Sequence, residues 1–311
     1  TADPISTYQV KGGMMYDINS DVSVFFNTGM VEKAPIMDNV IYFDGTVASD
    51  PANEKFLHNE FGVNYRFGKL GLNASAYSTD WQDRNLTKSV TTGQGDSGDT
   101  DVIFLTGVNQ KHSGVELETN YMVNDMLDLM FVASFGNWKF DGDANGNYQE
   151  TEYNSEGQAI GYTTTEYAYA LDGLYVGDMP QTSYVLGVTL KPIKDLRIQA
   201  IHKMYDKNYS DWSPSAREFD GTNDDADRSQ VWEAPSYSRL DLHMSYKLPK
   251  VKDLDMVLTA NIFNALDEVY VQDAVDNSQY NGYGTKNHLA HNAEVFLGTP
   301  RYANIGLSIG F

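Results

Sequence analysis

The chain has 311 residues, which is enough for one or two ordinary domains or for a single large β-structure. Its net charge of −21 argues against nucleic acid as a partner, because that binding depends on cationic side chains that neutralise phosphates. The sequence also excludes a helical membrane protein, since no apolar run approaches the roughly 20 residues that a transmembrane helix needs.

The chain has no cysteine, so it can form neither disulfides nor thiolate metal sites. It opens on Thr1 without the basic and apolar regions of a secretory signal peptide. If the protein is exported, we expect its true start to lie upstream of Thr1.

Pairs of alternating segments joined by short turns recur along the chain, and such pairs predict β-hairpins. The predicted hairpins cover residues 8–27, 61–77, 115–135, 184–200 and 240–262, with turns at 17–21, 68–69, 124–125, 192–195 and 250–253. One further strand, residues 303–311, ends the sequence on Phe311. The prediction is therefore eleven strands.

The predicted strands have one apolar side and one polar side, with the clearest alternation near the end of the chain. Apolar residues there fall on one side at period two. They are Leu240, Leu242, Met244, Tyr246 and Leu248. A soluble antiparallel sheet with one wet face would show the same alternation.

The connections between the hairpins are long, and we predict irregular loops in them. These loops lie before residue 60 and over about 78–112, 139–181, 201–235 and 271–300. Five successive alternations of short turns and long loops are typical of outer-membrane barrels and unusual for a soluble sheet. We therefore predict an all-β fold, a transmembrane antiparallel β-barrel with short periplasmic turns and long extracellular loops.

The strand count also indicates that the barrel is incomplete. With eleven strands, the first and the last run in the same direction, so closing the ring would pair them in parallel. Bacterial single-chain barrels use an even number of antiparallel strands, and unpaired backbone groups in hydrocarbon each cost several kcal/mol. We predict that residues 1–311 are the C-terminal part of a barrel whose other strands lie upstream of Thr1.

Three stretches of the sequence match a known family. Residues 16–35, from Tyr16-Asp17-Ile18-Asn19 to Lys33-Ala34-Pro35, look like a mid-barrel hairpin with a Lys/Arg-x-Pro step. Residues 261–270, Asn-Ile-Phe-Asn-Ala-Leu-Asp-Glu-Val-Tyr, look like a penultimate strand, and Gly298-Thr299-Pro300-Arg301 leads to a closing strand that ends on Phe311. With these features the chain resembles the TonB-dependent receptors of Gram-negative outer membranes, within them the versions common in Bacteroidetes.

The resemblance implies a barrel of 22 strands, of which residues 1–311 supply about eleven, the C-terminal half, while the plug domain and N-terminal strands are absent. It implies energy-coupled uptake of a scarce ligand: a siderophore, haem, a vitamin, a glycan or a peptide. The implied partners are the remaining strands and plug, the inner-membrane TonB complex, lipid, lipopolysaccharide and a surface lipoprotein. It also implies that Phe311 is a signal for barrel insertion.

Other functions remain open at this point. A passive outer-membrane channel or surface scaffold, completed by a partner chain, would use the same strands. An outer-membrane hydrolase is a weaker alternative, because the sequence contains no nucleophile-elbow pattern and no phosphate-binding glycine loop. We therefore expect that the chain is not an enzyme.

One loop matches a calcium-binding pattern, with acidic and amide side chains at alternating positions, a glycine and a late glutamate. The candidate ligands are Asp141, Asp143, Asn145, Asn147 and Glu152. An ordinary solvated acidic loop is the alternative reading. A second acidic cluster, Asp220, Asp224, Asp225 and Asp227, has less specific spacing and is interpreted as solvated.

Aromatic and histidine residues of the later loops are candidate ligand-binding groups, since aromatic faces stack on sugars or flat chelates and imidazoles ligate metals. The candidates are Tyr205, Tyr209, Trp212, Trp232, His288 and His291. Trp138 ends a predicted strand and belongs to the same aromatic group. An aromatic girdle at the membrane interface and a plain polar loop are the alternatives.

Overall fold

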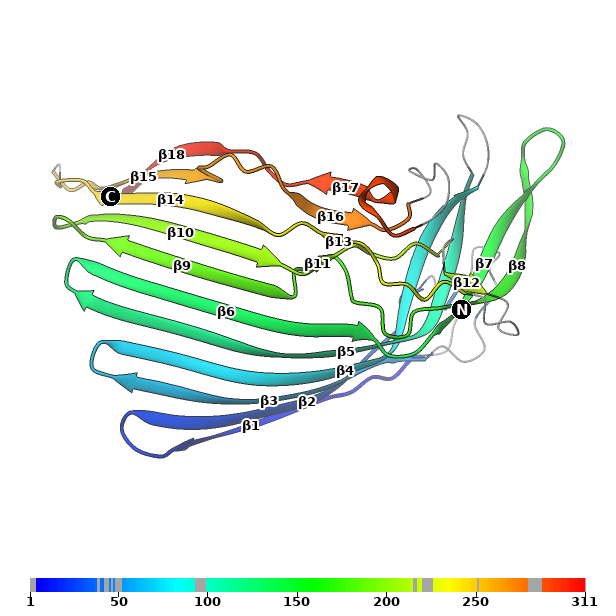
Figure 1. The fold of residues 1–311 in the computed structure, drawn as a ribbon, viewed down its shortest axis with the longest axis horizontal. Helices are drawn as coiled ribbons and strands as arrows, with labels where there is room; N and C mark the ends of the chain where they lie inside the picture. The colour runs from blue at the N-terminus through cyan, green and yellow to red at the C-terminus, as the bar shows by residue number, and fades with distance from the viewer. Residues whose placement is uncertain are drawn as a thin grey trace.

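One large antiparallel sheet makes up most of the computed structural model (Figure 1). The structure describes residues 4–37, 40–41, 45, 47, 52–92, 99–214, 217–219, 226–250, 252–278 and 287–310. Fourteen described strands belong to this sheet, and three of them, β7 (Ala144–Tyr153), β8 (Ala159–Tyr169) and β12 (Glu218–Phe219), lie off its main path. In spatial order the eleven strands of the main path are β1 (Gln9–Asp17), β2 (Val22–Lys33), β3 (Glu54–Phe67), β4 (Leu70–Thr92), β5 (Asp99–Asn124), β6 (Leu127–Phe140), β9 (Thr182–Leu190), β10 (Leu196–Asp206), β14 (Tyr237–Lys247), β15 (Asp255–Phe263) and β18 (Tyr302–Gly310). These are the eleven strands that the sequence predicted.

Short turns and long connections lie at opposite ends of the sheet. The five predicted hairpins are confirmed as β1–β2, β3–β4, β5–β6, β9–β10 and β14–β15. Figure 1 shows their turns at the left end, together with the C-terminus, and the long connections at the right end. The strict alternation that the sequence indicated is therefore a property of the fold.

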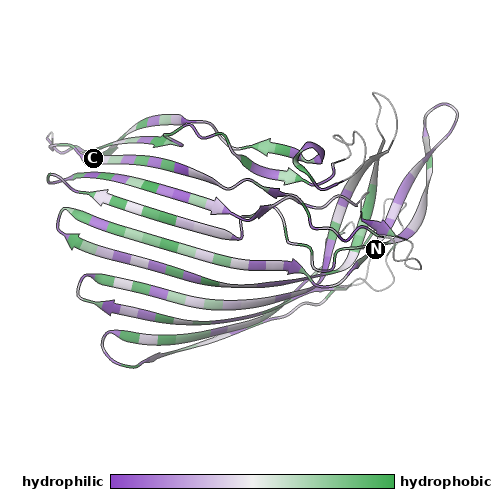
Figure 2. Ribbon diagram, viewed as in Figure 1, coloured by the Kyte–Doolittle hydropathy of each residue, from purple (hydrophilic) through white to green (hydrophobic). Residues whose placement is uncertain are grey.

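A single register aligns the apolar positions of all eleven strands on one side of the sheet. Cross-strand partners on this side include Val24 with Val63, and Leu258 with Leu307. The bands of Figure 2 follow this alternation along each strand. Such side chains are widely exposed, with Phe61 at 54% and Ile305 at 79%. We call this side the apolar face and the opposite side the polar face.

Removal of apolar surface from water contributes about 25 cal/mol per Å², and this face would forgo that stabilisation if water covered it. A continuous apolar band of tilted strands is the surface that a lipid bilayer solvates. In the part of the chain that the structure describes, no helix is long and apolar enough to cross a membrane.

The long connections are more ordered than the sequence predicted. Residues 78–112 are not an irregular loop, because β4 and β5 continue pairing as far as Thr92 with Asp99. The predicted loop 139–181 contains a second hairpin, β7 (Ala144–Tyr153) with β8 (Ala159–Tyr169), and β7 pairs with β5. The strands β7 and β8 extend the sheet beyond its loop end (Figure 1) and lack the one-sided apolar alternation that marks the other strands.

The connections have a hydrophobic core of their own. Phe140 and Tyr169 each contact Trp212, with ring centroids 6.4 and 6.0 Å apart. Buried residues of β5, the β6–β9 connection and the β10–β14 connection complete this core, namely Ile103, Leu105, Val108, Ala144, Leu171, Leu174, Tyr209 and Val231. The short strands β11 (Asn208–Tyr209) and β13 (Glu233–Ala234) pair beside it. The loop end is thus a packed layer.

Asn264 fixes the turn that follows β15, within the stretch that resembles a penultimate barrel strand. Its backbone is left-handed, with φ of 49°, a conformation that asparagine tolerates better than most residues. The buried amide donates to the carbonyl oxygens of Glu268 at 2.9 Å and Thr299 at 3.2 Å and accepts from the Glu268 amide at 3.0 Å. The Asn264 backbone amide donates to Asp241 at 2.9 Å. One side chain therefore joins β15 to the segment before β18.

Replacing Asn264 by alanine should loosen this turn. The variant loses three hydrogen bonds and leaves buried backbone groups without partners, which costs about 1–3 kcal/mol per group. We expect faster amide hydrogen exchange at residues 264–270 and 298–301 in the intact protein, measured by mass spectrometry. The matched variant Asn154→Ala, in the exposed turn between β7 and β8, should leave those segments unchanged. Equal protection of these amides from exchange in Asn264→Ala and in the wild type would contradict the role of the Asn264 side chain in fixing this turn.

The two edge strands of the sheet run in the same direction. β1 leads into the short turn at residues 18–21. β18 is antiparallel to β15, which starts at a short turn, so β18 also runs toward the turn end. Among the described residues, β1 has only β2 as a neighbour and β18 has only β15. A direct junction between the two edges would be parallel.

Candidate functional site

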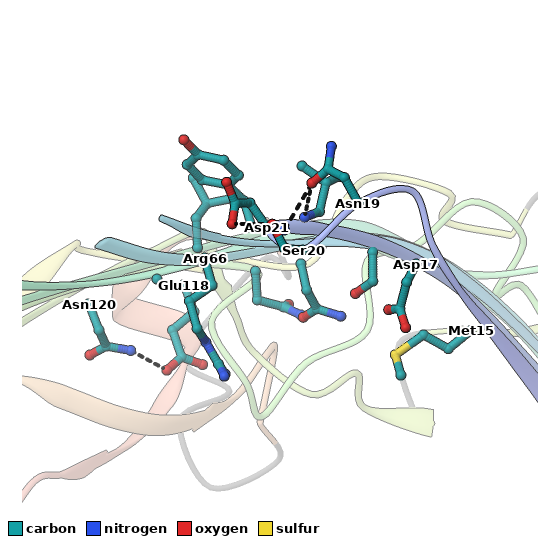
Figure 3. Close-up of a pocket in the computed structure, with 15 residues that line it drawn as sticks. Met15, Asp17, Asn19, Ser20, Asp21, Arg66, Glu118 and Asn120 are labelled. Carbon is teal, nitrogen blue, oxygen red and sulfur yellow. Dashed lines mark hydrogen bonds between the residues drawn. The ribbon is translucent and has the colours of Figure 1, made fainter. Parts of the chain in front are cut away.

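A polar cavity of about 580 Å³ lies on the polar face near the turn end (Figure 3). Strands β1 to β5 line it, and Arg66 and Glu118 place charges of both signs in it. Asn120 donates a hydrogen bond to Glu118 at 2.9 Å, drawn as a dashed line in Figure 3. This part of the sheet can contact water or other polar surfaces, and the alternation in the sequence predicted such a polar side.

A row of aromatic rings lies on the same face nearer the loop end. Four neighbouring strands supply them: Phe56 from β3, Trp81 from β4, His112 from β5 and Trp138 from β6. Successive ring centroids are 4.6, 6.4 and 5.6 Å apart. We call these four residues the aromatic shelf; with Tyr77 and their neighbours they line a cavity of about 370 Å³.

Hydrogen bonds hold both indole rings of the shelf in place. Trp138 Nε1 donates to the Tyr77 hydroxyl at 2.9 Å. Trp81 Nε1 donates to Glu54 Oε2 at 3.2 Å, and the Arg84 guanidinium lies 4.2 Å from the centroid of the Trp81 ring. Because both indole N–H groups already donate to partners within the protein, the ring atoms that remain available to the cavity are carbon atoms.

Sequence reasoning identified only Trp138 of this shelf. It assigned Trp81 to an irregular loop, and the pairing that extends β4 and β5 is what brings the other rings into line. Extending the register of the predicted hairpins into these segments would have found the shelf. Phe56 is the cross-strand partner of Trp81, and His112 is the cross-strand partner of Trp138.

The aromatic residues predicted from the later loops lie in two environments. Tyr205 pairs with Tyr237 on the polar face, at 5.0 Å between centroids, so it does not face lipid as a girdle residue would. Tyr209 is buried against Tyr175, and Trp212 is 2% exposed within the loop core. The Trp232 carbonyl accepts hydrogen bonds from Ser210. Tyr209 and Trp212 therefore stabilise the loops and offer no open ring face.

The two predicted histidines have different surroundings. His288 lies between two carboxylates, with Nδ1 2.5 Å from Asp276 and Nε2 2.7 Å from Asp227. His291 is exposed in the 3-10 turn η4 (Ala290–Asn292), 3.2 Å from the amide of Asn287. Among the described residues, no group of three or more histidine, aspartate and glutamate side chains is arranged to hold a metal ion.

Arg217 joins two long connections through a buried ionic network. It is 0% exposed, and its Nη2 lies 3.5 Å from Asp276, which is 1% exposed. Its Nη1 donates to the Asp227 carbonyl at 2.7 Å. Burial raises the pKa of the Asp227 carboxyl, but the hydrogen bonds from His288 and Ser229 outweigh burial and lower that pKa to about 2.

Replacing Arg217 by methionine should open the junction between the two connections. Loss of one partner from a buried ion pair typically costs about 3–5 kcal/mol, because the other charge stays buried. We expect faster hydrogen exchange at residues 226–231 and 271–278, with β14 unchanged. The control Lys247→Met removes an exposed pair with Asp255 and should alter little. Unchanged exchange in Arg217→Met would show that the network does not hold the loops.

Acid should weaken the same junction. The pKa of Asp227 is lower in the folded state than its ordinary 3.8, so its contribution to stability is complete above about pH 4 and is lost as the pH falls toward about 2. The groups that face it are Arg217, His288 and Ser229. Hydrogen exchange of residues 226–231, corrected for intrinsic rates, should accelerate from pH 5 to pH 3, and Asp227→Asn should remove the difference. Protection independent of pH in the wild type would contradict this.

The residues of the calcium pattern are not gathered around one point. Asp141 pairs with Lys111 at 2.7 Å. Asp143 accepts two hydrogen bonds from Arg228, at 3.0 and 2.8 Å, which lower the pKa of its carboxyl. Asn145, Asn147 and Glu152 lie in the extended strand β7, where a chelating loop would have to turn. Calcium binding therefore stays a prediction from the pattern alone.

Some predicted residues lie outside the described part of the chain. They are Phe311, Asp220, Asp224 and Asp225.

Comparison with known proteins identifies the fold. The model of the family "TonB dependent receptor-like, beta-barrel" matches residues 6–265. The chain belongs to this family. Its members are outer-membrane proteins of Gram-negative bacteria, which places the apolar face against lipid and the polar face toward the lumen of the barrel. The narrower likeness to the versions common in Bacteroidetes stays a prediction.

Solved structures of TonB-dependent receptors share this fold. The ferric enterobactin receptor PfeA from Pseudomonas aeruginosa matches with a TM-score of 0.58 and 14% identity, over 97% of this chain and 40% of that one. The ferric-catecholate import receptor Fiu from E. coli K12 matches with 0.56 and 14%, over 96% and 34%. The ferric yersiniabactin receptor FyuA from Yersinia pestis matches with 0.56 and 15%, over 97% and 37%. No curated protein matches the chain.

The chain spans well under half of the length of these structures, between 34% and 40%. At such low identity the likeness concerns the fold. The ligands in the names of these receptors are therefore properties of those proteins.

Proposed function

We propose that this chain is the C-terminal half of the barrel of an outer-membrane receptor that takes up a scarce ligand with energy relayed from the inner membrane. The observation that carries the proposal is the open sheet of eleven strands with edges that run in the same direction. Eleven further strands would close it into an even, fully antiparallel ring of 22, the size of plugged outer-membrane transporters. A coverage of 34–40% of the solved receptors agrees with a half-barrel.

The polar face suits the lumen of such a barrel. Charged side chains line it and are paired along the wall, as Lys203 is with Asp241 at 2.9 Å. In this proposal a plug domain from the upstream part of the protein fills the lumen and contacts the inner-membrane TonB complex. Lipid and lipopolysaccharide surround the apolar face, and a surface lipoprotein contacts the loops. The packed loop end captures the ligand, and rearrangement of the plug admits it.

Two features set this function apart from a passive channel. The loop connections form a layer with its own core, which suits a capture surface more than an open mouth. The chain also belongs to a family of receptors. The ligand classes compatible with the scaffold are siderophores, haem, vitamins, glycans and peptides, and the solved receptors above are described as acting on ferric chelates.

The intact protein should be closed to ions. We expect the full-length product of the gene, purified and reconstituted in a planar bilayer, to show no steady conductance, because a plug occupies the lumen. We expect mild urea to unfold the plug before the barrel, whose backbone groups are all paired within the bilayer, and so to open large steady currents. Steady conductance of the untreated protein would favour the passive channel.

Residues 1–311 alone should not form a closed barrel. The two edges of the sheet would have to pair in parallel or remain open in hydrocarbon, where each unpaired backbone group costs several kcal/mol. We expect refolding in detergent to give aggregates or dimers, with no monomeric species whose gel mobility changes on heating. A monomeric, heat-modifiable barrel of this fragment would overturn the half-barrel proposal.

A further inference from the structure

We propose that the aromatic shelf of Phe56, Trp81, His112 and Trp138 binds a neutral, hydroxylated ring ligand, of which an oligosaccharide is the natural example. The inference rests on the proposed function, since it places the ligand on the lumen wall of a receptor. Three properties of the shelf carry it: how the rings lie, which of their atoms are free, and which charges surround them.

The rings of Trp138 and Tyr77 lie flat against the sheet because the neighbouring strand positions are glycine. A Cβ atom at Gly136 would come within 2.8 Å of the Trp138 ring, and one at Gly114 within 2.6 Å of the Tyr77 hydroxyl. Any larger residue would therefore push these rings away from the wall. A ring that lies on the wall turns one broad face toward the lumen.

Those faces suit stacking more than hydrogen bonding. Both indole N–H groups already have partners in Tyr77 and Glu54. The ring of His112 is near parallel to that of Trp138, with 21° between their planes. Together they make a continuous apolar strip, on which the C–H face of a pyranose ring or another flat apolar face can lie.

The polar groups around the strip are suited to hydroxyl groups. The cavity is lined by the carboxylates of Glu60 and Glu116, which accept hydrogen bonds, and by His58, whose Nδ1 lies 2.7 Å from the Thr79 hydroxyl. No lysine or arginine is among the described residues that line it. A few placed polar groups around an aromatic surface are typical of small-ligand sites.

The same charges oppose an anionic ligand. The carboxylates of Glu60 and Glu116 would repel a negatively charged chelate. Lys33, which pairs with Glu54 at 3.2 Å, and Arg84, whose guanidinium lies over Trp81, are not among the described residues that line the cavity. The carboxylates of Glu54, Asp211 and Asp178 interact with that guanidinium. This negative lining disfavours anionic ligands, whereas the hydroxyl groups of a neutral ligand can donate hydrogen bonds to its carboxylates.

Other aromatic groups of the chain lack this combination. Tyr237 and Tyr270 also stack, at 4.4 Å between centroids, but there the Arg239 guanidinium lies over Tyr270 and donates to its hydroxyl. Arg84 lies over Trp81 of the shelf, but it is not among the described residues that line the shelf cavity. Tyr209 and Trp212 are enclosed in the loop core. The shelf therefore stands apart as an aromatic surface that is half-buried, fixed in orientation and open to the lumen.

The test is ligand binding by the purified full-length receptor and its variants, measured by calorimetry and by tryptophan fluorescence. The probes are maltohexaose, cellohexaose and laminarihexaose as neutral ligands, and ferric enterobactin and trigalacturonate as anionic ones. We expect at least one neutral probe to bind and neither anionic probe to do so. Trp138→Ala and Trp81→Ala should each weaken that binding by at least about tenfold.

Two matched pairs separate the shelf from general damage. Phe25→Ala removes another ring that lies over a glycine, Gly62, on the same face but outside the shelf, and should bind as the wild type does. Gly136→Ala should weaken binding although Trp138 is retained, whereas Gly71→Ala, where an added Cβ has 4.0 Å of space, should not. Gel mobility before and after heating confirms that each variant is folded.

Several outcomes would overturn the proposal. They are the absence of binding by every neutral probe, binding of the anionic probes alone, unchanged affinity in Trp138→Ala, and an equal loss in Phe25→Ala. None of them bears on whether the receptor is plugged and energy-coupled, because the bilayer conductance of the wild type answers that question separately.

Discussion

The structure depends on one constraint, the pairing of every backbone N–H and C=O group in a medium without water. In hydrocarbon an unpaired group has no solvent partner, so a sheet can cross a bilayer only as a continuous ladder. The described residues form such a ladder from β1 to β18, with antiparallel partners throughout. The same constraint makes the two edge strands, β1 and β18, informative, because their common direction means that a direct junction between them would be parallel.

The ladder also couples the two faces of the wall. Since side chains alternate at period two, a register that turns Val63 and Leu258 toward lipid necessarily turns their neighbours toward the lumen. The aromatic shelf is a consequence of that coupling, because Phe56, Trp81, His112 and Trp138 are lumen-facing positions of four adjacent strands. Glycine at positions 114 and 136 then decides how the rings lie. Above the wall, where lipid no longer selects the pattern, the connections are stabilised by a core around Trp212 and by the ion pairs of Arg217.

Particular elements show how far sequence reasoning reached. The hairpin turns were predictable because residues such as Gly68 and Asp195 adopt positive φ between two alternating segments. The extension of β4 and β5 was not, because both faces of that hairpin leave the bilayer and the one-sided apolar pattern disappears. The calcium pattern at Asp141 to Glu152 failed to predict local shape for a related reason. The spacing of the pattern assumes a loop that turns on itself, whereas pairing with β5 and β8 keeps β7 extended. The Asp143 carboxylate instead accepts hydrogen bonds from Arg228.

By itself the sequence determined the strand number, the sequence of short turns and long connections, the apolar face and the parity of the edges. The apolar face follows from the periodicity of each segment, and the number of strands and the parity of the edges follow from counting such segments along the chain. Only the tertiary structure decided which side chains meet. The shelf joins residues from four strands, and the Arg217 network joins Asp227 to His288, 61 positions along the chain. Such contacts depend on register between distant segments and on the space that glycines leave, and neither is written in the periodicity of any one strand.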